Sequence, residues 1–161
     1  MAITSNDPRN PKLSTPNEMR HPVYGILEAD SQSFKAGELV YLSSGAATVC
    51  ASDATKVYGI ALKDATNVTS GNIEIPILPI YPQDDLIMQV SSGGTVEAAN
   101  TTCTPGTNYG LVVSSNHHTV DSAETSTEVF HFERELLKAD GSADYWAVVH
   151  LLATVAQTLI E

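Results

Sequence analysis

The stretch that decides the fold runs from residue 34 to residue 63. It reads FKAGELVYL (34–42), SSG (43–45), AATVCA (46–51), SDATK (52–56) and VYGIALK (57–63). The apolar runs are short, rich in Val, Ile, Leu, Tyr or Thr, and bounded by Gly, Ser or Asp, which is typical of strands joined by tight turns. In the first run both faces are apolar, with Leu39 and Tyr41 on one and Val40 and Leu42 on the other. We predict strand, turn, strand, loop and strand, the first buried on both faces.

A similar series of segments follows later in the chain. It reads LIMQV (86–90), SSGG (91–94), TVEAA (95–99) and, after a polar loop, YGLVV (109–113). The triplet Tyr-Gly-Ile at 58–60 corresponds to Tyr-Gly-Leu at 109–111. Two units are too few for a solenoid, which needs at least ~3 repeats. The alternative to an internal duplication is chance similarity between short strands that are bounded by glycine. We predict a mainly β fold, a small β-barrel or β-sandwich with an internally repeated strand unit.

Composition limits the classes of function. At 161 residues the chain is predicted to form one domain that buries roughly 70% of its unfolded surface. The net charge of −11, with eight basic residues, argues against nucleic acid as a partner, because phosphate binding depends on Lys and Arg. No apolar run approaches the ~20 residues that span a membrane. Without a secretory signal, Cys50 and Cys103 are predicted to be free, partly buried thiols.

Residues 1–22 differ in composition from the single β-rich domain predicted for residues 23–161. This segment holds four of the eight prolines and few apolar residues, so we expect an extended arm that forms neither helix nor ladder. Arg9, Lys12 and Arg20 give the arm a formal charge of +1, against −12 for the remainder. A slightly basic arm on an acidic body suggests docking on a neighbouring copy or another protein. A tail without a partner is the alternative.

Four isoleucines mark a candidate subunit interface. Ile73, Ile75 and Ile77 alternate with Glu74 and Pro76, and Ile80 follows. Because proline cannot donate to a ladder, Pro76 indicates an edge strand or a bulge. An apolar edge of this kind is safest when another subunit covers it.

The C-terminal third contains one ambiguous segment. A polar loop, 114–127, with His117 and His118 is expected first. Residues 125–138 then fit either a helix, from a capping-box pattern and helical spacing, or a strand that turns at Asp140-Gly141 into the next one. We favour a short helix there, followed by a buried strand at 145–152.

No catalytic pattern stands out. The chain lacks a Gly-x-Ser-x-Gly elbow, and neither cysteine has a local base. His117 and His118 are adjacent, so on a strand they would point to opposite faces, which disfavours a shared metal. The carboxylates at 84–85 and at 133 and 135 resemble solvated acidic loops. We predict a protein that is not an enzyme and has no cofactor.

The segment from Ser33 to Leu62 resembles the small capsid cement, or decoration, proteins of tailed bacteriophages. The shared features are an aromatic-Lys-x-Gly-Glu-Leu-Val strand, a glycine turn at Gly45, and the Gly59-Ile60-Ala61 strand. The resemblance covers residues 23–80 and, more weakly, 86–113. It implies a non-enzymatic, mostly β homotrimer on the outer surface of the virion capsid, bound to the major capsid protein and bridging neighbouring capsomers.

Within that resemblance, we assign capsid or subunit contact to Arg9, Lys12 and Arg20 and the subunit interface to the four isoleucines. The competing class is a carbohydrate-binding or adhesive module of a phage fibre or spike, in which the loop 114–127 and Trp146 would form the contact surface. A tail-tube or baseplate component is a third hypothesis.

Overall fold

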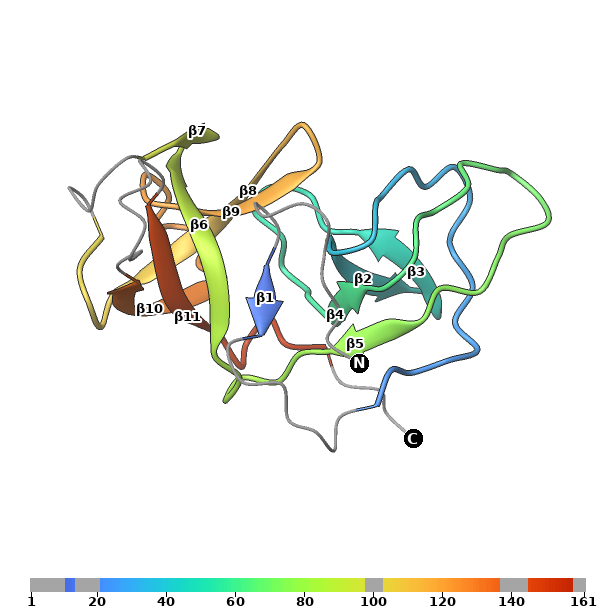
Figure 1. Ribbon diagram of the computed structural model, residues 1–161, viewed down its shortest axis with the longest axis horizontal. Coiled ribbons are helices and arrows are strands. Elements are labelled where there is room, and N and C mark those ends of the chain that lie inside the picture. The colour runs from blue at the N-terminus through green and yellow to red at the C-terminus, as the bar shows by residue number, and fades with distance from the viewer. Residues whose placement is uncertain (1–10, 14–20, 98–102, 137–144, 158–161) are drawn as a thin grey trace.

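The computed structural model describes residues 11–13, 21–97, 103–136 and 145–157 (Figure 1). All regular secondary structure in those ranges is β-strand, so the mainly β prediction is confirmed. The strands are β1 (Lys12–Leu13), β2 (Leu39–Ser43), β3 (Ala46–Val49), β4 (Gly59–Ala61), β5 (Ile77–Pro79), β6 (Leu86–Ser92), β7 (Thr95–Val96), β8 (Asn108–Ser114), β9 (His117–Asp121), β10 (Phe130–Leu136) and β11 (Trp146–Leu151). Within these ranges there is no helix with the length and apolar character that a membrane crossing would require.

The stretch 34–63 forms most of a four-stranded antiparallel sheet in the order β3-β2-β4-β5. Its predicted first turn is confirmed, with Ser43 paired to Ala46 around a two-residue loop. Ser44 and Gly45 have φ values of 49° and 81°, which match the right-handed twist of a tight hairpin. The Ser-Gly pair thus fixes the register in which β2 and β3 meet.

The extended segment 23–29 covers both edges of this sheet. Val23 exchanges two backbone hydrogen bonds with Ile77 of β5, at 2.8 and 3.0 Å. Farther along, the amide of Ala29 donates to Ala47 of β3, and the amide of Ala47 donates to Leu27. The strand predicted at 23–29 is therefore hydrogen-bonded, but through isolated bridges rather than a regular ladder.

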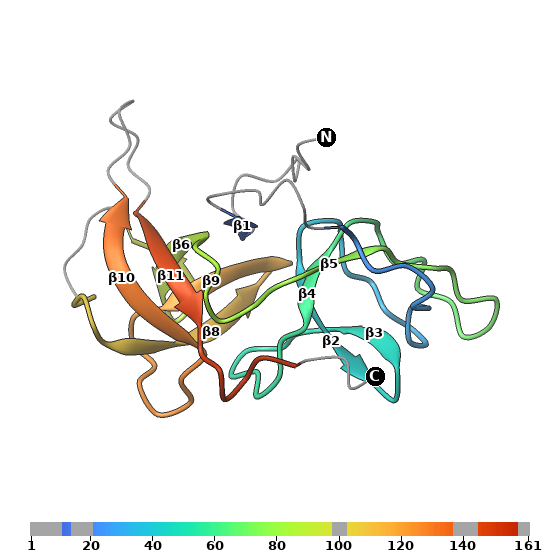
Figure 2. The same ribbon diagram turned by 90° about the horizontal axis from the view of Figure 1, so that it is seen from below.

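The remaining strands form a seven-stranded sheet that closes on itself. β6 pairs with β11, β11 with β10, β10 with β8, and β8 with β9, all antiparallel, and β9 returns to β6 in parallel. The result is a five-stranded barrel, which lies beside the four-stranded sheet in both views (Figures 1 and 2). Closure removes the open edges that a flat sheet would present.

β1 extends the barrel on the side of β6 that faces away from β11. Lys12 pairs with Ile87 and Leu13 with Leu86, whereas β9 pairs with β6 only at Val90 and Ser91. β1 thus occupies backbone groups that β9 leaves open. The expectation that residues 1–22 form no ladder is wrong for these two residues.

One apolar cluster joins the two sheets. Leu39 and Ile60 of the four-stranded sheet share it with Leu86, Met88 and Val149 of the barrel. A second cluster lies on the other face of the four-stranded sheet, where Val40 packs with residues of segments 23–34 and 73–77. β2 is therefore buried on both faces, as predicted.

The C-terminal segment after β11 returns to the four-stranded sheet. Val57 donates to the carbonyl of Val155 and accepts from the amide of Gln157, both at 2.8 Å. The side chain of Gln157 also accepts from the amide of Leu42 at 2.7 Å and donates to its carbonyl at 2.9 Å. The side chain of Gln157 thus makes the two hydrogen bonds with Leu42 that the backbone of a neighbouring strand would otherwise make.

The short helix favoured at 125–138 is wrong. Residues 130–136 form β10, which pairs with β11 as a hairpin. Phe132 pairs with Val149 and Arg134 with Val148, so Glu133 is the extra residue of a β-bulge. The bulge shifts the alternation of side chains, so Phe132 lies opposite Val149 and Leu136 opposite Trp146, three positions away on β11, and the two side chains do not share a face.

Two further expectations are corrected. The loop predicted at 114–127 is mostly structured, because β8 continues to Ser114 and turns through Ser115 and Asn116 into β9. The repeat holds only locally: β2–β3 and β6–β7 are both hairpins with glycine at the turn. However, β4 pairs with β2, whereas β8 pairs with β9 and β10 and not with β6. The two units therefore occupy different topologies.

Candidate functional site

The predicted arm contacts are only partly within the described residues. Arg9 and Arg20 lie outside them, and Lys12 belongs to β1 on the barrel of its own chain. Pro11, just before β1, is buried. Residues 12 and 13, in the described part of the arm, thus pair with β6 of the same chain.

The isoleucines assigned to a subunit interface lie largely in the core of this chain. Ile75 and Ile77 are fully buried in the cluster behind the four-stranded sheet, and Ile80 is 2% exposed in the cluster shared with the barrel. Ile73 is partly buried. The alternating pattern therefore reflects packing within the chain, and the side chains of the three buried isoleucines are not available to a neighbour.

A cleft of about 420 Å³ opens between the four-stranded sheet and the β8–β9 hairpin. Its walls come from three parts of the chain. The lining residues are Ser33, Phe34, Glu38, Val49, Cys50, Ala51, Ser52, Val113 and Asn116. Burial raises the pKa of the Cys50 thiol, which also contacts the carbonyl of Lys56, so this sulfur stays protonated at neutral pH and is a poor nucleophile. The prediction of two free thiols is confirmed.

Beside the cleft, a buried acid meets a buried histidine. Glu38 precedes β2 and His118 lies on β9, and their side chains are 1% and 0% exposed. His118 Nε2 lies 3.7 Å from Glu38 Oε2, too far for a hydrogen bond, and Glu38 Oε1 and both ring nitrogens lack hydrogen-bond partners among the described residues. His117 is only partly buried, so the two adjacent histidines face opposite ways, as predicted.

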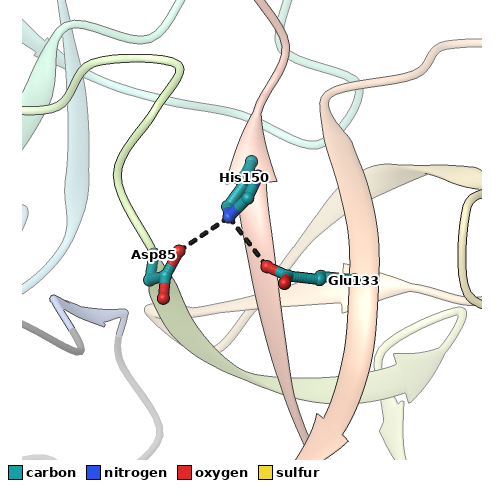
Figure 3. Close-up of side chains that lie close together, drawn as sticks. All are labelled: Asp85, Glu133 and His150. Carbon is teal, nitrogen blue, oxygen red and sulfur yellow. Dashed lines mark hydrogen bonds and ion pairs between the residues drawn. The ribbon is translucent and has the colours of Figure 1, made fainter.

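A second polar group gathers on the outside of the barrel. His150 on β11 lies between Asp85, just before β6, and Glu133 at the bulge of β10 (Figure 3). His150 Nε2 is 2.7 Å from Asp85 Oδ1 and 2.9 Å from Glu133 Oε2. The three side chains are between 30% and 46% exposed, so solvent reaches them. A ring nitrogen and two carboxylates can hold a cation or relay a proton.

Sequence reasoning missed this group. The carboxylates at 85 and 133 were expected to belong to solvated acidic loops, and His150 was not singled out. Asp85 and His150 are 65 positions apart, and only the pairing of β6 with β11 brings them together. The bulge that places Glu133 beside them was itself taken for a helix, so no local signal marked the group.

Another buried carboxylate has a structural role. Glu28, 1% exposed, accepts hydrogen bonds from the amide and hydroxyl of Thr66 and from the amide of Ile73. Burial acts to raise the pKa of Glu28, and these hydrogen bonds together outweigh it and lower that pKa. Glu28 thereby ties the segment 23–29 to the loop 63–72.

Trp146, proposed as a contact residue of an adhesive module, is 3% exposed on β11. A sugar-binding platform requires an accessible aromatic face, so Trp146 cannot serve as one in this structure. Comparison with known proteins found no family model, no curated protein and no solved structure that matches this chain.

Proposed function

We propose that this protein is a capsid decoration protein of a tailed bacteriophage, with a structural rather than a catalytic role. It binds the outer surface of the capsid through the major capsid protein, bridges neighbouring capsomers as a homotrimer and stabilises the head. The observation that carries the proposal is the sequence phrase at 33–62. Those residues form one continuous antiparallel unit, β2, β3 and β4, as expected if the phrase encodes a single structural unit.

The mechanism is mechanical. A trimer that touches several capsid subunits detaches only when all its contacts break together, which raises its effective affinity far above that of one contact. Closed sheet edges suit this role, because they limit unwanted pairing between densely arrayed copies. The acidic body, with a formal charge of −12, keeps a decorated particle soluble.

The adhesive alternative has less support. Its two contact elements were the loop 114–127 and Trp146. Much of that loop is the β8–β9 hairpin, and Trp146 is buried. No observation in the described residues favours it over the decoration role.

The test is binding to capsids that lack this protein. Full-length protein is expected to cosediment with such capsids, and light scattering is expected to give the mass of a trimer. Deleting residues 2–20 is expected to weaken capsid binding while the body stays folded. The variant Arg9→Ala/Lys12→Ala/Arg20→Ala keeps the arm and removes only its charge, so it separates charge pairing from chain contacts. Failure of the full-length protein to bind capsids would refute the proposal, and unchanged binding after deletion would refute the arm assignment.

A further inference from the structure

We propose that Asp85, Glu133 and His150 form a binding site for a divalent transition-metal ion, with Zn²⁺ the best fit. The site is independent of the decoration role. It follows from the donor set, from the way two carboxylates meet one ring nitrogen, and from the strands that hold them.

The donor atoms converge as ligands around one ion do. Asp85 Oδ1 and Glu133 Oε2 both approach the same nitrogen, His150 Nε2, and ligand atoms from all three residues lie within 4.8 Å of one another (Figure 3). That nitrogen carries at most one proton, and one N–H makes one well-directed hydrogen bond. The contact with Asp85 has hydrogen-bond geometry, and the contact with Glu133 lies within ion-pair distance. A cation between the three residues would use a lone pair from each and offset the repulsion between the two carboxylates.

The strands hold the three residues in fixed relation. Asp85 directly precedes Leu86, which pairs with Val149, the neighbour of His150. On the other side of β11, the bulge at Glu133 interrupts the regular alternation, and the side chains of both Glu133 and Arg134 are exposed. Beneath the site, Leu86, Phe132 and Val149 are fully buried. Ligands on paired strands over a packed core are pre-organised, which favours binding.

The chemistry selects among metals. Zn²⁺ accepts imidazole nitrogen and carboxylate oxygen, and sites with three protein ligands keep one position open to water or another ligand. Ca²⁺ and Mg²⁺ prefer oxygen ligands alone, so the histidine disfavours them. Because the three side chains are partly exposed, an ion could enter directly from solvent.

The experiment is a calorimetric titration of the tag-free, full-length protein with Zn²⁺ in a non-chelating buffer. One ion per chain is expected. His150→Gln, Glu133→Gln and Asp85→Asn are each expected to weaken binding at least about tenfold, since removing even an outer partner of a ligand costs 10- to 100-fold. A thermal melt without metal checks that each variant folds. The same titration with Ca²⁺ or Mg²⁺ is expected to show no comparable binding.

His131→Gln is the matched control. His131 lies directly opposite His150 in the β10–β11 ladder, is also partly buried, and contacts Asn108 instead of the carboxylates. It is expected to bind Zn²⁺ like the unaltered protein. Equal loss in His131→Gln and His150→Gln, or binding that survives in all three ligand variants, would place the ion elsewhere. No binding at about 1 mM Zn²⁺, a concentration at which even a millimolar dissociation constant would be detected, would mean that the group is an ion pair and nothing more.

Discussion

At the scale of single residues, close packing leaves no free space for a Cβ atom at two glycines of this protein. Gly59 and Gly110, the central residues of the two Tyr-Gly triplets, show why those triplets look alike. A Cβ atom on Gly59 would lie 2.3 Å from the carbonyl oxygen of Leu78, and one on Gly110 would lie 2.5 Å from the side chain of Glu124. Both positions exclude a side chain, so the sequence similarity has a local steric cause and does not require a duplicated fold.

Glu28 provides a pH-dependent test at this scale. Glu28→Gln is expected to lower the free energy of unfolding at pH 7 by about 2 kcal/mol, because the amide replaces a charged acceptor of several hydrogen bonds. Folding lowers the pKa of Glu28, so its stabilisation is complete above the ordinary glutamate pKa of about 4.3 and is lost as pH falls through the folded value. Urea unfolding at pH 7 and pH 3 is therefore expected to show a smaller difference at pH 3.

Glu74→Gln is the control for this prediction. Glu74 is an exposed carboxylate on the adjoining segment, so its replacement is expected to change stability by less than about 0.5 kcal/mol. A difference between Glu28→Gln and the unaltered protein that stays constant from pH 7 to pH 3 would contradict the role assigned to the charge.

At the scale of elements, sequence patterns predicted the segments whose structure depends on a few adjacent residues. The hairpin at 43–46 and the buried strand at 145–152 were predicted because a Ser-Gly turn and an unbroken apolar run are visible in a few residues. β10 was not predicted, because Val129, Phe132 and Leu136 recur at helical spacing, and the bulge that interrupts the strand's alternation depends on pairing with β11. The metal-binding group could not be predicted, because it depends on pairing between strands distant in the sequence.

The contact between Glu38 and His118 links the two sheets. His118→Leu is expected to lower the free energy of unfolding by about 3–5 kcal/mol, because it leaves a buried carboxylate without its partner. The double variant Glu38→Leu/His118→Leu is expected to recover most of that loss, since two apolar groups need no partner. Urea unfolding of both single variants and the double variant completes the cycle.

His117→Leu is the control, because it changes the neighbouring residue on the opposite face of β9. We expect it to lower the free energy of unfolding by less than His118→Leu does. If the double variant is as unstable as the sum of the single variants, the two buried groups do not interact, and their proximity has no energetic role.

At the scale of the whole molecule, the apolar cluster that both sheets share predicts that they unfold as one unit. We expect a single thermal transition with equal calorimetric and van't Hoff enthalpies. Leu39→Ala tests the coupling: Leu39 is fully buried in the four-stranded sheet, whereas Trp146, the only tryptophan, lies in the barrel. This substitution is expected to cost about 2–5 kcal/mol and to lower the unfolding midpoint reported by Trp146 fluorescence.

Lys35→Ala, at a side chain that is 57% exposed, controls for nonspecific effects and is expected to leave that midpoint nearly unchanged. Two resolved transitions, or a fluorescence midpoint that Leu39→Ala does not move, would mean that the barrel unfolds independently of the four-stranded sheet.

The return of residues 155–157 to the four-stranded sheet affects the order of events during synthesis. β2 and β4 are translated early. However, the hydrogen bonds of Val57 with Val155 and Gln157, and of Leu42 with Gln157, involve residues that are translated after β6 to β11. The first sheet can therefore begin to form on the ribosome and cannot be completed there until translation has passed the barrel. A chain that stops before residue 155 lacks those bonds although it contains β1 to β11, so we expect prematurely terminated products to be more sensitive to proteolysis.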